Sequence, residues 1–367
     1  MELLTIGAFA RAARLSPKAL RLYDELGLLR PAEVDPVSGY RRYAAGQLER
    51  ARLVAWLRRL GMPLARIRSV LALEPGAAAA EVAAYWERVR AETEARRELA
   101  AFLVDHLSGK DTAMGNTTGT LRVEYAAGSD RGLVRERNDD CAYAGPGLVA
   151  VADGMGPQGG GQQAGEAAIA ALRGLEPPAG ELLNALEDAL AGLDAEVGAA
   201  GGLPGAGTTL TAVLWSGSQL ALVHIGDSRA YLLRDGGLLR ITHDHTLVQS
   251  LVDEGRLTLA EAASHPQRTL LVRALTGSGD GRPDVSLHGA RPGDRYLLCS
   301  DGLSRWVAEE RLRTVLAAAA DPAEAVRRLI ALAHDAGAPD NVACAVADVL
   351  PGADGPDGTG GSDGASG

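Results

Sequence analysis

The chain has 367 residues, and its 47 acidic and 37 basic side chains give a formal net charge of −10. This length exceeds what one hydrophobic core usually sustains, so two or three domains are expected. Three cysteines exclude a secreted scaffold built on disulfides, and no apolar run approaches the roughly 20 residues of a membrane-spanning helix. We therefore expect a multidomain protein of the cytoplasm.

The charge is divided unevenly along the chain. Residues 1–73 hold 13 Arg or Lys against 6 Asp or Glu, and residues 74–110 hold 5 against 7. Residues 111–367 hold 19 against 34. A basic head on an acidic body indicates a separate partner for each part, so the acidic total does not exclude nucleic acid.

The basic head begins with start signals for two short helices. Thr5 can cap a first helix that runs to about Arg14, and Ser16 followed by Pro17 favours a second helix that stops near Gly27. The other expected elements are a β-hairpin wing over residues 31–43 and helices over residues 45–60 and 63–73. On spacing alone, a small helical domain with a solvated arginine face and a DNA reader are equally good interpretations.

The motifs of residues 3–73 resemble those of the MerR family of transcription regulators. They are Leu4-Thr5-Ile6-Gly7, Ser16-Pro17-Lys18, Arg21-Leu22-Tyr23-Asp24, Gly27-Leu28-Leu29, Gly39-Tyr40-Arg41-Arg42-Tyr43 and Leu60-Gly61. The resemblance implies a winged helix-turn-helix domain over residues 1–73 that binds double-stranded promoter DNA. The DNA contacts that it implies are Ser16, Lys18, Arg21 and Tyr23 in the major groove and Tyr40 and Arg41 on the backbone. A degenerate winged helix used only for dimerisation is the competing hypothesis.

MerR-type regulators usually dimerise through a long helix after this domain, and residues 74–107 can supply one. Apolar residues recur there every three or four residues and form a stripe along one helix face, but the middle of this stripe is polar. A helix packed on its own domain is therefore the alternative. Residues 1–140 contain no cysteine, which excludes thiolate metal sensing by the head. Residues 108–119 are expected to be a linker and residues 351–367 a disordered tail.

In the acidic body, several apolar runs of strand length end in aspartate. Strands are expected over residues 148–152, 208–215, 220–225, 296–299 and 341–349, and helices over 162–174, 181–197, 245–254, 307–318 and 322–336. Carboxylates at strand ends can converge on one rim of a β-sandwich, where they would repel one another without a cation. Oxygen ligands with little His or Cys beside them suit Mn²⁺ or Mg²⁺ rather than zinc.

This body resembles the metal-dependent Ser/Thr protein phosphatases of the type 2C (PPM) family, particularly the actinobacterial members. The motifs that carry the resemblance include Asn138-Asp139-Asp140, Asp153-Gly154-Met155-Gly156, Gly226-Asp227-Ser228-Arg229, Ser300-Asp301-Gly302-Leu303-Ser304 and Pro339-Asp340-Asn341. The implied fold for residues 120–350 is α+β, a sandwich of two antiparallel sheets flanked by helices. The implied partner is a phosphoprotein, such as a Ser/Thr kinase or its targets.

The resemblance also implies a role for each matched residue. Asp153 would bridge two Mn²⁺ or Mg²⁺ ions, one of them also bound by the Gly154 carbonyl, with Asp301 and Asp340 holding the first ion. Asp140, assisted by Asp139, would organise the site's waters, and Asp227 with Asp301 would form a third, weaker metal site. Arg135 would bind the phosphoryl group of phosphoserine or phosphothreonine while a metal-activated water attacks phosphorus. Residues 243–276 would form a mobile flap that helps to choose substrates.

The sequence departs from the family pattern at several positions. Arg305 stands where the family has an acidic residue, and no histidine follows Gly154 to serve as a general acid. A dinucleotide-binding loop at Gly154-x-Gly156-x-x-Gly159 is disfavoured because Asp153 would repel pyrophosphate. The remaining alternative to an enzyme is a transcription regulator whose body is a non-catalytic phosphoprotein or metal sensor. The complete ligand set favours the enzyme, and Cys141, Cys299 and Cys344 are expected to be buried apolar residues.

Overall fold

The computed structural model describes residues 3–107, 122–175, 182–216, 219–254 and 256–352. The expected linker over residues 108–119 lies outside this part of the chain, as does nearly all of the expected tail. The chain divides into two compact units. One comprises residues 1–89 with residues 246–270, and the other comprises residues 90–245 with residues 271–367.

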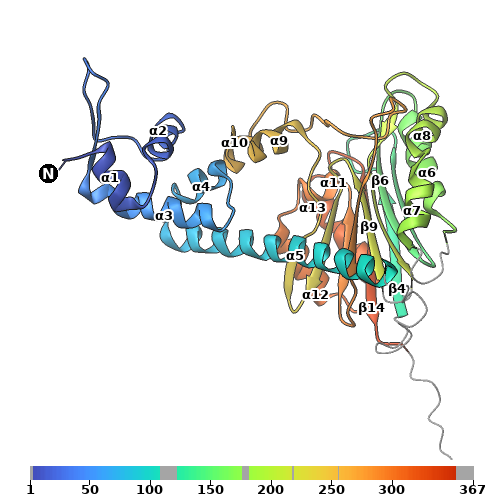
Figure 1. Ribbon diagram of the computed structural model, residues 1–367. Helices are drawn as coiled ribbons and strands as arrows, with labels where there is room; N and C mark the ends of the chain where they lie inside the picture. The colour runs from blue at the N-terminus through green and yellow to red at the C-terminus, as the bar shows by residue number, and fades with distance from the viewer. Residues whose placement is uncertain (1–2, 108–121, 176–181, 217–218, 255, 353–367) are drawn as a thin grey trace, which may run out of the picture. The chain divides into compact units, whose positions relative to one another are not determined.

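The head consists of short helices and a small sheet (Figure 1). Its helices are α1 (Ile6–Ala13), α2 (Pro17–Glu25), α3 (Leu48–Arg59) and α4 (Leu64–Val70), and its strands β1 (Leu3–Thr5), β2 (Glu33–Val34) and β3 (Arg41–Ala44) pair in the order β1-β3-β2. The expected caps are confirmed: Thr5 Oγ1 accepts from Ala8 N at 3.3 Å, and Ser16 Oγ accepts from Ala19 N at 3.0 Å. Strand β1 was not expected, because three residues of Leu-Leu-Thr carry no distinct period.

Helix α5 (Pro75–Leu107) follows the head as one continuous element. Near its start, Val82 and Tyr85 pack against the head's own hydrophobic core, and Glu81 pairs with Arg66 at 2.6 Å. The start of α5 therefore packs on its own domain, as the alternative interpretation predicted. Dimerisation through α5 stays a prediction.

Residues 246–270 belong to the same compact unit as the head and form two short helices, α9 (Leu247–Asp253) and α10 (Leu259–Ala263). Thr258 and Glu261 form a capping box at the start of α10. Glu261 also pairs with Arg68 of α4 at 3.3 Å, although Glu261 is largely exposed, so this ion pair contributes little stability.

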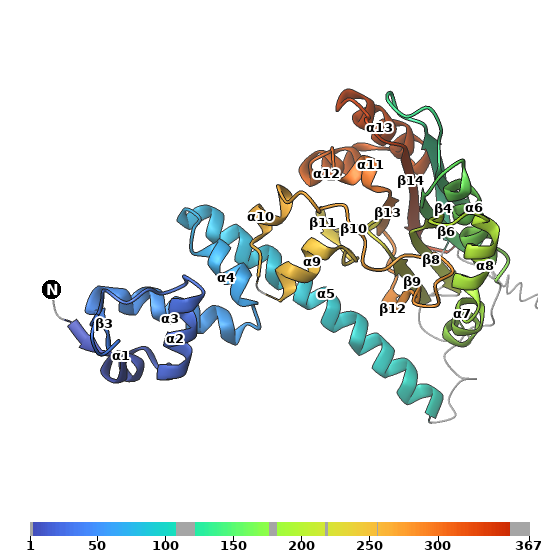
Figure 2. The same ribbon diagram turned by 90° about the horizontal axis from the view of Figure 1, so that it is seen from above.

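The body is a sandwich of two antiparallel sheets with helices on both outer faces (Figure 2). One sheet has the order β11-β10-β13-β14-β4, and the other has the order β12-β9-β8-β6-β5 with β7 paired to β6. The strands are β4 (Arg122–Asp130), β5 (Asp140–Gly145), β6 (Leu148–Met155), β7 (Gly207–Thr208), β8 (Leu210–Ser216), β9 (Gln219–Ile225), β10 (Arg229–Arg234), β11 (Gly237–Arg240), β12 (Asp284–Gly289), β13 (Arg295–Cys299) and β14 (Val342–Leu350). The expected sandwich is confirmed.

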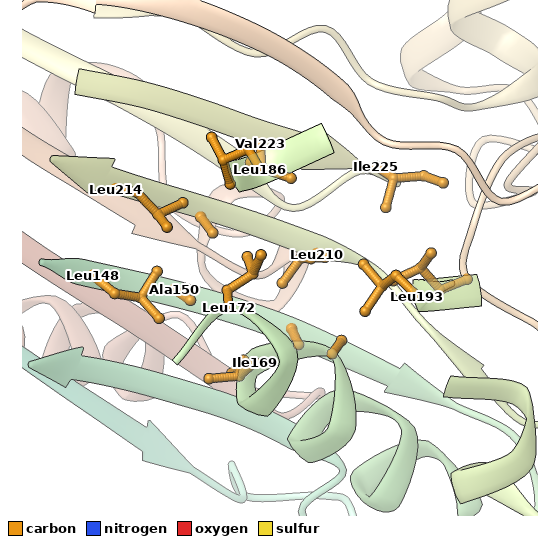
Figure 3. Close-up of a cluster of buried hydrophobic side chains, with 14 of the residues drawn as sticks. Leu148, Ala150, Ile169, Leu172, Leu186, Leu193, Leu210, Leu214, Val223 and Ile225 are labelled. Atoms are coloured by element: carbon orange, nitrogen blue, oxygen red, sulfur yellow. The ribbon is translucent and has the colours of Figure 1, made fainter. Parts of the chain in front are cut away.

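Helices α6 (Gly160–Leu172), α7 (Leu182–Leu190) and α8 (Leu193–Gly201) cover one outer face. Leucine, isoleucine and valine side chains such as Leu172, Leu210 and Val223 fill the space between these helices and the sheet (Figure 3). The expected single helix over residues 181–197 was wrong, because the chain breaks at Ala191-Gly192, where glycine disfavours helix. Helices α11 (Asp301–Ser304), α12 (Glu309–Ala318) and α13 (Pro322–Asp335) cover the other face.

A third apolar layer lies between the two sheets. Alternate residues of facing strands build it, among them Val151 and Leu222 from one sheet and Leu298 and Ala345 from the other. Cys299 and Cys344 point the other way, into the core beneath α11, α12 and α13, and both are fully buried, as expected, whereas Cys141 is only half-buried. The sandwich core therefore fixes the position of one sheet's strand ends against those of the other.

Candidate metal and phosphate site

Two of the predicted metal ligands face each other across the β5–β6 pair. Asp140 and Asp153 are register partners, so both carboxylates lie at the same edge of one sheet. Asp153 is held there by backbone contacts, because its N–H donates to Thr209 Oγ1 at 3.0 Å and its carbonyl accepts from Thr209 N at 2.9 Å. At Gly154, a Cβ would overlap the backbone of Gly161 and lie 2.5 Å from the Asp139 carbonyl. Only glycine fits this crossing of three backbone segments.

The other sheet supplies Asp301 and Asp340. Asp301 opens helix α11 directly after β13, and Asp340 precedes β14. The Arg135 guanidinium donates to Asp340 Oδ2 at 2.8 Å, and its side chain is 57% exposed. The structure thus places an accessible arginine beside carboxylates from both sheets, and its binding of a phosphoryl group stays a prediction.

Burial and mutual repulsion raise the pKa values of the acids in this cluster. Desolvation raises the pKa of Asp140 to about 7, with further contributions from Asp301 and Asp340. Desolvation and the neighbouring carboxylates also raise the pKa of Asp153 well above its ordinary value, and raise that of Asp301. Such a cluster is unfavourable when fully ionised unless a positive charge enters it.

The donor set fits hard divalent cations. Asp139 Oδ1 and Asp140 Oδ2 are buried without a hydrogen-bond partner, although buried acceptors are nearly always paired. Carboxylate and backbone carbonyl oxygens are the ligands that Mg²⁺ and Mn²⁺ prefer. Within the described residues, no three His, Cys, Asp or Glu side chains are already arranged to hold an ion. Asp340, Asp301 and Asp227 are engaged by arginines instead.

One of these arginines is Arg305, at the sequence position where an acid was expected. Its Nη2 lies 2.7 Å from Asp301 Oδ2 and 3.2 Å from Asp227 Oδ2. Asp227 follows β9, is buried, and has its pKa raised to about 7 by desolvation and by Asp301, against the opposing effect of Arg305. The structure therefore brings Asp227 to the site, but in an ion pair.

Asn341 has a part that the sequence interpretation did not give it. Its Nδ2 donates to the carbonyls of Arg131 at 2.8 Å and Arg137 at 2.7 Å, while its Oδ1 accepts from Asp139 N at 3.0 Å. One side chain thereby holds the loop that carries Arg135 and Asp139. The sequence signal that could have indicated this role is the position of Asn341, a single polar residue between an acid and a buried strand.

In the head, the predicted DNA-binding residues divide by exposure. Lys18 and Arg21 are exposed on α2, and Tyr40 is 56% exposed before β3. Arg41 pairs with Asp24 at 2.7 Å, and Ser16 caps α2. Tyr23 is only 6% exposed and packs in the head's core, where desolvation raises its pKa. The contacts of all six residues with DNA stay predictions.

A family model for protein phosphatase 2C matches residues 135–347, which is more than half of the chain. The chain belongs to the protein phosphatase 2C family. Its N-terminal region is a MerR domain, since a model for MerR HTH family regulatory proteins matches residues 4–74 and one for MerR DNA binding matches residues 48–109. The phosphatase 2C domain and the MerR domain thus correspond to the acidic body and the basic head.

Relatives of the phosphatase 2C domain are serine/threonine phosphatases. The chain is 54% identical over 239 residues to serine/threonine protein phosphatase PstP of Mycobacterium tuberculosis, covering 63% of this chain but 46% of that protein. It is 32% identical to serine/threonine phosphatase stp of Listeria monocytogenes, covering 58% of this chain and 91% of the relative. The chain therefore spans about half the length of PstP.

Solved structures agree with the fold. The crystal structure of the M. tuberculosis phosphatase PstP/Ppp matches with a TM-score of 0.59 and 52% identity, over 64% of this chain and all of that one. The PstP catalytic domain in complex with two manganese ions matches with a TM-score of 0.58 and 50% identity, over 63% of this chain and all of that one. In the part of the chain that the structure describes, no helix is both long and apolar enough to cross a membrane.

Proposed function

We propose that this chain is a Mn²⁺- or Mg²⁺-dependent protein serine/threonine phosphatase joined to a DNA-binding regulator. The observation that carries the proposal is the meeting of Asp140 and Asp153 from one sheet with Asp301 and Asp340 from the other, beside the guanidinium of Arg135. The 54% identity to PstP supports the same activity.

Each residue has a distinct task in this proposal. Asp153, Asp301 and Asp340, with the Gly154 carbonyl, would hold two divalent cations, and Asp140 with Asp139 would orient water within the site. Bound cations would supply an acidified water and offset the charge of the phosphoryl group. Arg135 would bind two phosphoryl oxygens through its planar fork and hold the phosphate in line for attack.

The enzymatic proposal is tested by hydrolysis of a phosphothreonine peptide with the purified full chain and Mn²⁺. Asp153→Asn keeps the side-chain volume but removes the charge, and we expect it to lose nearly all turnover. Asp335→Asn, an exposed position on α13, is the matched control and should keep it. A wild-type chain that binds Mn²⁺ but releases no phosphate would instead make the body a non-catalytic sensor.

For the head, we propose binding to promoter DNA as a homodimer in the cytoplasm. The exposed Lys18 and Arg21 on α2 support it, because basic side chains on a recognition helix can reach phosphates and guanine edges. Lys18→Ala with Arg21→Ala should abolish preference for the chain's own upstream DNA over random DNA in an anisotropy assay. Arg327→Ala on α13 should leave binding unchanged, and a wild type without sequence preference at moderate salt would refute the proposal.

A further inference from the structure

Arg305 lies between two acids that the sequence had assigned to a third metal ion. Its Nη2 atom contacts Asp301 Oδ2 at 2.7 Å and Asp227 Oδ2 at 3.2 Å, so one nitrogen bridges the two carboxylates. Asp227 lies on the turn between β9 and β10, and Asp301 directly follows β13; because β10 pairs with β13 and Arg229 is the register partner of Cys299, the two carboxylates lie at the same end of adjacent strands. The bridge therefore spans the same gap that a shared cation would span.

Local structure determines this placement. Asp301 opens α11, and Arg305 stands four residues later, where its backbone N–H donates to the Asp301 carbonyl at 2.9 Å. Residues four apart share one face of a helix, so the guanidinium returns to the carboxylate of its own turn. The Arg305 side chain is 26% exposed and Asp227 is buried, which shields the pair from solvent.

We propose that the Arg305 guanidinium replaces the third cation in this chain, so that the site holds two metal ions and one permanent organic cation. Arg305 is then a positioning residue: its contact at 2.7 Å holds the Asp301 carboxylate in orientation for the first metal ion. This inference rests on the proposed metal-dependent function.

Two physical reasons support the replacement. An arginine is protonated at every physiological pH, so its charge cannot be removed to make room for an ion. A divalent cation would also need the same two Oδ2 atoms at about 2.0–2.6 Å, next to a group of its own sign.

Charge balance gives the same answer. The site holds six carboxylates, from Asp139, Asp140, Asp153, Asp227, Asp301 and Asp340, against the two guanidiniums of Arg135 and Arg305. Six negative charges against two positive ones leave −4, which two divalent cations neutralise.

The test is the number of Mn²⁺ ions bound per full chain, measured by equilibrium dialysis against MnCl₂ up to millimolar concentration. We expect two ions for the wild type and for Arg305→Lys, which keeps the charge, and three for Arg305→Asp. Arg311→Asp is the matched control: it changes the charge equally at an exposed position on α12 and should bind two. It also corrects for weak binding to the acidic surface.

Equal numbers of ions for the wild type and Arg305→Asp, whether two or three, would overturn the inference. If Arg305→Asp fails to fold, Arg305→Gln removes the charge at similar length, and it too should admit a third, weaker ion. A wild type that binds no Mn²⁺ would refute the proposed function itself, so the two failures are distinguishable.

Discussion

Replacement of Asn341 by alanine tests how the loop of residues 131–139 is held. The substitution removes three hydrogen bonds, from Nδ2 to the carbonyls of Arg131 and Arg137 and to Oδ1 from Asp139 N. At about 1 kcal/mol net for each bond, the phosphatase domain should lose about 3 kcal/mol of unfolding free energy. For a domain of this size, that corresponds to a fall in Tm of roughly 6–12 °C.

The local effect can be measured separately from the global one. Hydrogen exchange of peptides spanning residues 131–140 should accelerate in Asn341→Ala, since the Asp139 amide loses its acceptor. Asn341→Asp keeps an acceptor but turns an oxygen toward two carbonyl oxygens, so it should be less stable than the alanine variant. Asn184→Ala, exposed on α7, is the control and should change neither quantity. A loss below about 1 kcal/mol with unchanged exchange would refute the reasoning.

Three further predictions follow from the same site and core. Burial raises the pKa of Asp140 to about 7, so the folded state favours the protonated form of this carboxyl. The stability that Asp140 contributes to the folded state is therefore complete below the pKa of the unfolded state, near 4, and is lost as pH rises through 7. The Tm of EDTA-treated protein should therefore fall between pH 5 and 8 and be restored by Mn²⁺, and a Tm that rises with pH would contradict this. Gly302→Ala places a Cβ on the backbone carbonyl of the residue before β14 and should cost about 2 kcal/mol in urea unfolding, whereas Gly46→Ala, with open space around it, should cost much less. Burial raises the pKa of Cys299 to about 12 and that of Cys344 still further, so neither thiol should react with Ellman's reagent before unfolding; rapid labelling of any thiol other than the half-buried Cys141 in the native chain would show that the core opens.

Much of the fold was predictable because its elements carry strong local signals. Ser16-Pro17 is a strong start signal for a helix, and the short apolar run over residues 148–152, which lies between Gly147 and Gly154, favours a buried strand. Strand β1 and the break between α7 and α8 were missed because short segments depend on their neighbours more than on their own composition. Pairing with β3 makes a strand of Leu3–Thr5.

The candidate site was predictable in its members but not in its pairings. Motif order identified Asp153 and Arg135, and the spacing of four residues allows Arg305 to reach Asp301, but nothing in the sequence says that Arg305 also reaches Asp227, because Asp227 comes beside Asp301 only when β10 pairs with β13. The same limit applies to Tyr23. The family resemblance implied a DNA contact for Tyr23, but the helix face that Tyr23 occupies is turned toward the head's core.

The division of the ligands between two sheets has a consequence for how the protein is built. Asp140 and Asp153 belong to one sheet, and Asp301 and Asp340 are attached to the other, so bound ions would cross-link the two sheets. Any substitution in the apolar layer between the sheets, for example at Val151 or Leu298, would then alter ion affinity from a distance by changing their spacing. Measured metal affinity would then report how closely the two sheets of the sandwich pack.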